Sequence, residues 1–205
     1  MQPHDDVRAQ ISTSSHVYAL LARLWLKEVD SRLIRQLHQA ELAKAFLQVG
    51  GVLPEDSQCE SLAAEYCQLF VGPQNHLPPY QSVWETGQLQ SEVTTSIQQF
   101  ADLLRYRLHH QYARTMLDHL GNQLEIMARA TSSECRQASP QVADEVAAEF
   151  FKRHLCWPDR LLKEALRRSH SQFYRAIIEL TSNFLDAERE HWRTWPTPSA
   201  SHADV

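Results

Sequence analysis

Apolar residues recur at helical spacing along most of the chain. In residues 18–25, 62–70 and 173–184 they return every three or four positions, which places them on one face of a helix. Runs of β-branched residues are rare, and the chain has only five glycines. The pattern predicts an all-α fold, a single helical-bundle domain of about eight to ten helices spanning residues 1–205.

Capping residues, glycines and prolines divide this pattern into separate helices. We expect helices over residues 16–28, 31–49, 54–71, 91–107, 119–131, 141–155, 158–168 and 171–191. The predicted N-caps are Ser14-Ser15, Asp30 and Asp118, and the predicted stops are Gly50-Gly51 and Gly72-Pro73. Leu103 is expected to face the core. The polar connector 131–140 is a candidate hinge, and residues 1–11 and 194–205 are expected to be frayed.

Residues 72–87 form a predicted loop rich in proline and aromatic residues, which we call the Pro/aromatic loop. Pro78 and Pro79 favour an extended backbone, and Tyr80 and Trp84 are large rings on a segment that would otherwise be polar. The loop must therefore either pack against its own core or offer an apolar surface to a partner. Both interpretations stay open at this point.

Charge and composition narrow the classes of partner. Twenty basic and twenty-five acidic residues give a net charge of −5, which disfavours nucleic acid and suits a basic partner. The N-terminal residues have no secretory pattern, and the apolar run near Tyr18 is too short for stable membrane insertion. The four cysteines form no CxxC pair, so no zinc site is expected, and a reducing, cytoplasmic location fits them.

Motifs for catalysis are absent from the sequence. It has no phosphate-binding glycine loop and no nucleophile elbow, so the chain is not expected to be an enzyme. Eleven histidines keep an all-α metal-dependent hydrolase as one alternative, with His109, His110, Asp118 and His119 as the closest cluster. That cluster lacks the spacing that places two ligands on one helical face, so no metal site is predicted. A helical adaptor or scaffold protein is a further alternative.

Three stretches of the chain share a family's motifs. LFVGP at 69–73 is followed by PPYQSVW at 78–84, Asp118-His119 precedes a helix, and WPDRLLKEAL and QFYRAIIEL lie within 157–180. These stretches resemble the TorD/DmsD group of redox-enzyme maturation chaperones over roughly residues 60–185. The resemblance implies an all-α chaperone without catalytic residues. Its implied partner is the twin-arginine leader of a redox-enzyme precursor, commonly a molybdoenzyme subunit, held in the cytoplasm until the cofactor is inserted.

The resemblance and the residue types together give a candidate leader-binding site. The site residues are Leu69, Phe70, Pro79, Tyr80, Trp84, Glu85, Asp118 and His119. Aromatic and aliphatic side chains would form an apolar groove, and carboxylates would read the two leader arginines. We expect Asp118 to face that positive charge through or beside His119, at the base of the groove.

The chain departs from the family pattern at an acidic residue that would help bind a positively charged peptide. The family usually has Glu-Pro before its Asp-His motif, and Thr115-Met116 stand there in this chain. Glu85, next to Trp84, is the better candidate to replace the lost acid, because Glu125 lies off the helical face of His119. No resident cofactor is implied, transient binding of guanine nucleotide or molybdenum cofactor stays open, and so does a monomer against a domain-swapped homodimer.

Overall fold

The structure is a computed structural model that describes residues 3–39, 43–44, 46–47, 51–89, 92–108 and 115–195. Within those residues the fold is all-α without strands, so the predicted fold class is confirmed. The α-helices are α1 (Pro3–Leu26), α2 (Ser31–Leu37), α4 (Cys59–Tyr66), α5 (Gln81–Thr86), α6 (Glu92–Leu103), α7 (Leu120–Ala130), α8 (Ser133–Ala138), α9 (Pro140–His154), α10 (Asp159–Arg168) and α11 (Gln172–Arg193). A 3-10 turn, η1 (Asp56–Gln58), precedes α4, and a π-helical turn, η2 (Cys67–Val71), follows it.

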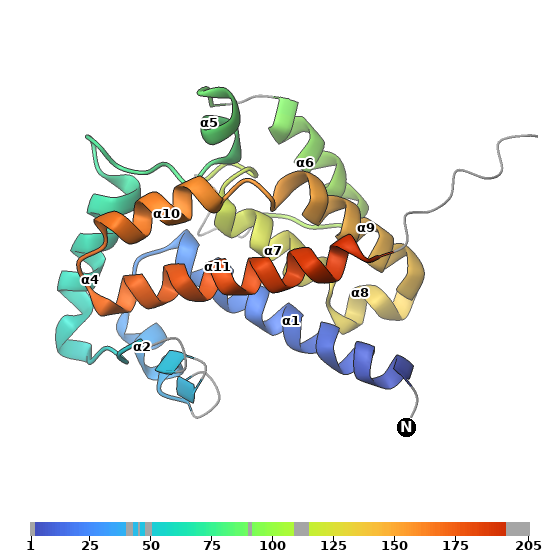
Figure 1. The fold of residues 1–205 in the computed structure, drawn as a ribbon, viewed down its shortest axis with the longest axis horizontal. Helices are drawn as coiled ribbons and strands as arrows, with labels where there is room; N and C mark the ends of the chain where they lie inside the picture. Colours follow the sequence, from blue (N-terminus) through green and yellow to red (C-terminus); the bar gives the residue numbers. More distant parts are fainter. Residues whose placement is uncertain are drawn as a thin grey trace, which may run out of the picture.

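The first and last helices are joined by one buried carboxylate. Glu188 on α11, only 7% exposed, accepts hydrogen bonds from Ser14 Oγ (2.8 Å), Tyr18 Oη (2.8 Å) and Trp192 Nε1 (2.9 Å). Three donors around one desolvated carboxylate offset the cost of burying its charge. We call this arrangement the Glu188 clasp. Figure 1 shows the start of α1 and the end of α11 at the same end of the molecule.

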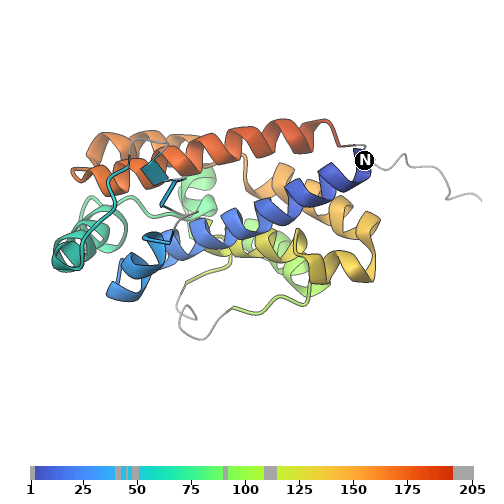
Figure 2. The same cartoon turned by 90° about the horizontal axis from the view of Figure 1, so that it is seen from below.

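Helix α1 lies between α11 and α7. Figure 2 shows α10 and α11 along one side of the molecule, with α1 between them and α7. The α1–α7 approach is close at Gly121, where an added Cβ would lie 2.4 Å from Leu26 Cγ and 3.2 Å from the Ala22 carbonyl oxygen. Only glycine fits that gap without displacing α1. This contact therefore sets how closely the first turn of α7 approaches α1. That first turn also carries the candidate site described in the next subsection.

The N-terminal boundary differs from the prediction. Helix α1 begins at Pro3, so residues 3–11 are helical rather than frayed, and proline suits a first helical position because it needs no N–H partner there. Ser14 and Ser15 lie inside α1 and cap nothing: Ser14 bonds Glu188, and Ser15 Oγ donates to the Ala128 carbonyl (2.9 Å). Both hydroxyls bond groups on other helices, so serine at these positions does not mark a helix start. The Asp30 cap is confirmed, because its carboxylate accepts the Leu33 N–H at 2.9 Å.

The expectation for Leu103 is wrong, whereas the hinge at 131–140 stays a prediction. The connector 131–140 contains α8, capped by Ser132 and tied to α9 by an ion pair between Arg136 and Asp144 at 2.8 Å. Leu103 is 70% exposed rather than buried. The stop at Gly72 is confirmed, because helical structure ends at Val71. Gly50 and residues 196–205 lie outside the described residues.

Candidate functional site

The Pro/aromatic loop is fastened to the start of α7 by backbone hydrogen bonds. The Gln81 N–H donates to the Asp118 carbonyl (3.0 Å), and the Leu120 N–H donates to the Pro79 carbonyl (2.8 Å). Together they form an isolated antiparallel bridge between Tyr80 and His119. Residues about 40 positions apart in sequence thus lie side by side, and the loop holds a fixed place on the bundle.

The second half of the predicted loop is a short helix, α5, and Asp118 caps it. One carboxylate oxygen of Asp118 accepts the Ser82 N–H (3.1 Å) and the Ser82 hydroxyl. Ser82 is the second residue of α5, so the carboxylate binds a free N–H in its first turn, where negative charge is favourable. The prediction that Asp118 caps α7 is therefore wrong. His119 is that cap, because its Nδ1 accepts the Gly121 N–H at 3.0 Å.

Both motif residues are buried. Asp118 is 0% exposed and His119 is 4% exposed. Burial lowers the pKa of His119 to about 3, so its imidazole is neutral at pH 7. Neither the Asp118 carboxylate nor the His119 imidazole therefore reaches solvent in this conformation, and the role of Asp118 toward a leader arginine stays a prediction. The second oxygen of Asp118, Oδ1, has no hydrogen-bond partner in the part of the chain that the structure describes.

A buried polar network lies beneath α5. The Gln81 side chain, 1% exposed, accepts from Gln123 Nε2 (2.7 Å) and lies 3.1 Å from His154 Nδ1, and its own Nε2 donates to the Arg153 carbonyl (3.1 Å). Gln123 Oε1 in turn accepts the Trp157 indole N–H at 2.9 Å. The network links α5 to α7, to α9 and to the turn before α10. The sequence analysis did not predict this network, because a glutamine near the start of a helix is usually exposed to solvent.

Leu69 and Phe70 also belong to the interior. Both are buried, and the Phe70 ring centroid lies 5.0 Å from that of Trp25 and 5.4 Å from that of Tyr66. The π-helical turn η2 carries both residues, and it directs Phe70 at Trp25 of α1 just before the chain leaves the helix at Gly72. In this conformation they support the loop from below and do not line a surface groove.

The remaining predicted residues form a surface, which we call the aromatic surface: Tyr80, Trp84 and Glu85. Tyr80 and Trp84 are half-buried, with the Tyr80 ring edge-on to His119 at 5.0 Å and the Trp84 indole N–H donating to the Pro78 carbonyl at 2.7 Å. Desolvation, with the nearby Asp118 charge, raises the pKa of Tyr80. Glu85 is exposed, and both its oxygens lie 3.1 Å from Gln81 Nε2. Pro79 is buried and contributes its carbonyl to the bridge.

Arg160 is a neighbour that the sequence did not identify. This exposed residue of α10 places its guanidinium carbon 5.9 Å from the centre of the Trp84 ring, within the range of a cation–π contact. The residue follows Pro158-Asp159 at a helix start, and nothing in that pattern tells which distant side chain it meets. The aromatic surface therefore already carries one arginine of its own.

Other candidate groups form no site in the described residues. No group of three or more His, Cys, Asp and Glu side chains there could hold a metal ion, and His109 and His110 lie outside the described range. Glu125 accepts a hydrogen bond from the Tyr106 hydroxyl at 2.5 Å. In the described part of the chain, no helix combines the length and apolar character needed to cross a membrane.

The chain was also compared with known protein families. A family model described as the nitrate reductase delta subunit matches residues 31–162. The matched range contains the Pro/aromatic loop, α5, α7 and the start of α10, and α11 lies outside it. It begins and ends earlier than the range of 60–185 expected from the motifs. A search of the curated proteins found no match to this chain.

Proposed function

The chain belongs to the nitrate reductase delta subunit family of redox-enzyme maturation chaperones, and we propose that it binds the twin-arginine leader of a molybdoenzyme subunit. The family consists of maturation factors rather than catalysts. The proposed role is to hold the precursor in the cytoplasm until its cofactor is inserted, with no resident cofactor in the chaperone. The chaperone would act as a monomer or as a domain-swapped dimer.

The observation that carries this proposal is the aromatic surface on its rigid support. Two half-exposed rings lie on a segment held by two backbone hydrogen bonds and by the Asp118 cap. A preorganised apolar surface loses little conformational entropy when a peptide binds. The apolar stretch of a leader is a suitable ligand for Tyr80 and Trp84.

Charge supports the same partner. Glu85 exposes a carboxylate directly beside Trp84, and the whole chain carries a net charge of −5. Complementary charge speeds encounter and disfavours acidic competitors. A leader that begins with two arginines is complementary both to the Glu85 carboxylate and to the net negative charge of the chain.

The proposal is tested by titrating a synthetic leader peptide, with two arginines followed by about twelve apolar residues, into the purified chain. Trp84→Ala should weaken the peptide by about tenfold or more, since large aromatic residues dominate such contacts. Trp195→Ala is the matched control, because Trp195 is also half-buried but lies just beyond the C-terminal end of α11. It should leave affinity within about twofold. Absence of binding to the unaltered chain, or equal losses in the two variants, would refute the proposal.

A further inference from the structure

The aromatic surface includes one carboxylate that is exposed and yet held in place. Gln81 and Glu85 are four residues apart on α5, so their side chains lie on the same face of the helix. Gln81 is only 1% exposed, whereas Glu85 is exposed, and both Glu85 oxygens lie 3.1 Å from Gln81 Nε2. The Glu85 carboxylate is therefore held at the surface by a buried amide.

The orientation of that amide is fixed by a chain of hydrogen bonds that begins at Trp157. An indole N–H can only donate, so the Gln123 atom that meets it at 2.9 Å is the carbonyl oxygen Oε1. The NH₂ group of Gln123 then faces Gln81 and donates to its Oε1 at 2.7 Å. The NH₂ group of Gln81 is left to face Glu85, and a carboxylate, which only accepts, favours the same orientation.

The Gln81 amide is held from two other sides as well. Its Oε1 lies 3.1 Å from His154 Nδ1, and its Nε2 donates to the Arg153 carbonyl at 3.1 Å. A flipped amide would set its oxygen against that carbonyl and against the Glu85 carboxylate, neither of which can donate. Gln81 therefore presents one orientation to Glu85. A side chain held in this way loses less conformational entropy when it binds a partner.

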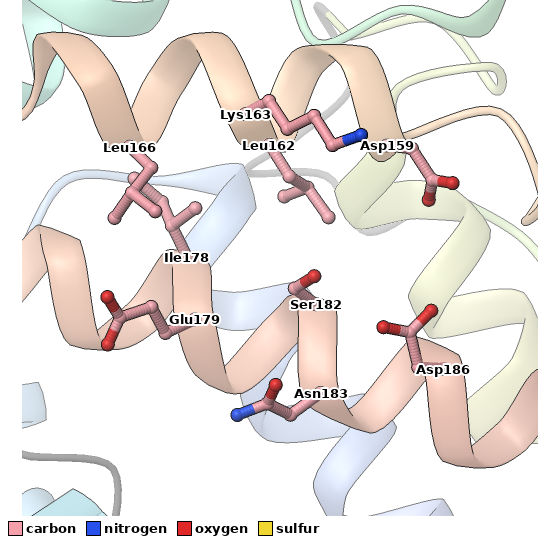
Figure 3. Close-up of a pocket in the computed structure, with 9 residues that line it drawn as sticks. All are labelled: Asp159, Leu162, Lys163, Leu166, Ile178, Glu179, Ser182, Asn183 and Asp186. Carbon is pink, nitrogen blue, oxygen red and sulfur yellow. The ribbon is translucent and has the colours of Figure 1, made fainter.

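The Glu85 carboxylate keeps both its charge and room for a partner. The Gln81 amide is neutral, and two carboxylate oxygens offer about four lone-pair sites. Glu85 forms no ion pair with any residue that the structure describes. By contrast, Asp159 and Asp186, labelled in Figure 3, both bind the guanidinium of Arg189, at 3.0 and 2.5 Å. Those two acids already have a cation, whereas Glu85 can receive one from a ligand.

We propose that Gln81, itself oriented by Gln123, is a positioning residue that holds the Glu85 carboxylate for an arginine of the leader. The buried amide acts on the leader only through Glu85, because Gln81 itself does not reach the surface. Its effect is therefore on the preference for arginine and not on the apolar contacts at Tyr80 and Trp84. The inference rests on the proposed function and adds the group that gives the aromatic surface its charge specificity.

The first test compares the leader peptide with a version in which glutamines replace both arginines, at low salt, where charge effects are largest. The unaltered chain should bind the arginine peptide about fivefold more tightly. Glu85→Gln should reduce this preference to less than about twofold. Glu92→Gln removes the same charge from an exposed position at the start of α6, and as the matched control it should keep the preference.

The second test addresses the positioning residue. Gln81→Met removes the donor to Glu85 and should reduce the arginine preference to about twofold. Ser96→Ala is its control, because Ser96 Oγ lies 3.0 Å from His154 Nε2 and contacts the same network at another point, so the preference should be kept. Both peptides are titrated into the same protein, so an unfolded fraction weakens both affinities equally and cancels from their ratio.

A double variant shows whether Gln81 acts through Glu85. Gln81→Met combined with Glu85→Gln should have the same preference as Glu85→Gln alone. Full preference in either single variant, or losses that add in the double variant, would refute the inference and leave the proposed function intact as long as Trp84→Ala still weakens the leader. If the leader does not bind the unaltered chain, both the inference and the proposed function fall.

Discussion

The predicted site residues divide into an interior half and a surface half. The buried residues are Leu69, Phe70, Pro79, Asp118 and His119, whereas Tyr80, Trp84 and Glu85 reach solvent. The interior residues make the contacts that hold the Pro/aromatic loop in place. The surface residues remain partly exposed to solvent. Residues from the same family motifs thus have different roles, either in stabilising the fold or in forming the surface, and their burial distinguishes the two.

The largest expected effect comes from the interior half. Phe70→Ala removes a buried ring that packs on Trp25 and Tyr66, and should lower the free energy of unfolding by about 3–5 kcal/mol. Leu103→Ala, on an exposed leucine, is the control and should change it by less than about 0.5 kcal/mol. Urea denaturation measures both. A Phe70→Ala protein as stable as the unaltered chain would show that Phe70 does not support the loop.

Asp118 tests whether the motif acts through the fold or through the ligand. Asp118→Ala leaves the Ser82 N–H and hydroxyl without their acceptor, at a cost of about 1–3 kcal/mol of stability. Asp118→Asn keeps an acceptor and should cost less, since Asn caps helices about as well as Asp. Peptide affinity of the folded Asn variant should stay within about twofold. A larger loss of affinity, absent for a leader without its arginines, would show that Asp118 recognises the leader's charge from its buried position.

Because His119 is buried, we expect the free energy of unfolding to depend on pH. Its folded pKa of about 3 lies below the usual 6.5, so the unfolded chain binds the proton more readily. Stability is therefore full above pH 6.5 and falls as the pH drops toward 3, by up to about 1.4 kcal/mol per pH unit. His154, with a pKa lowered by burial to about 4, adds a second contribution of the same sign.

His119→Asn separates the two histidines. Asparagine can still accept the Gly121 N–H as an N-cap, but it does not titrate. The slope of unfolding free energy between pH 6 and pH 4 should therefore decrease and keep its sign. An unchanged slope would mean that His119 is protonated in the folded state.

The smallest expected effect concerns Arg160 at the surface. Arg160→Gln removes a cation that competes with the leader for the Trp84 ring, so the leader peptide should bind about two- to threefold more tightly at low salt. Arg175→Gln, on another exposed part of the C-terminal helices, is a suitable comparison. Weaker binding in the Arg160 variant would indicate that Arg160 contacts the leader favourably.

Local signals in the sequence predicted much of the fold. Apolar periodicity located α7, α9, α10 and α11 to within a few residues, and Asp30 and Gly72 marked real boundaries. These features depend on residues within one or two helical turns. The start of α1 was missed because Ser14 and Ser15 bond distant helices.

The site was harder to predict because its contacts are distant in sequence. The motifs identified the segments that meet, yet the Asp118 carboxylate acts on Ser82, 36 positions away, rather than on its own helix. Gln81, Gln123 and His154 are ordinary polar residues until the fold encloses them together. The same limit applies to Arg160, whose contact with Trp84 depends on how α10 is placed against α5.

The Glu188 clasp has a consequence for the synthesis of the chain. Ser14 and Glu188 are 174 positions apart, which at a typical 5–20 residues per second corresponds to roughly 9–35 s of translation. Throughout that interval the Tyr18 hydroxyl lacks its carboxylate, and the face of α1 that turns toward α11 has nothing to cover it. The helix that covers this face of α1 is made long after α1, so the growing chain exposes apolar surface of its own until α11 has left the ribosome.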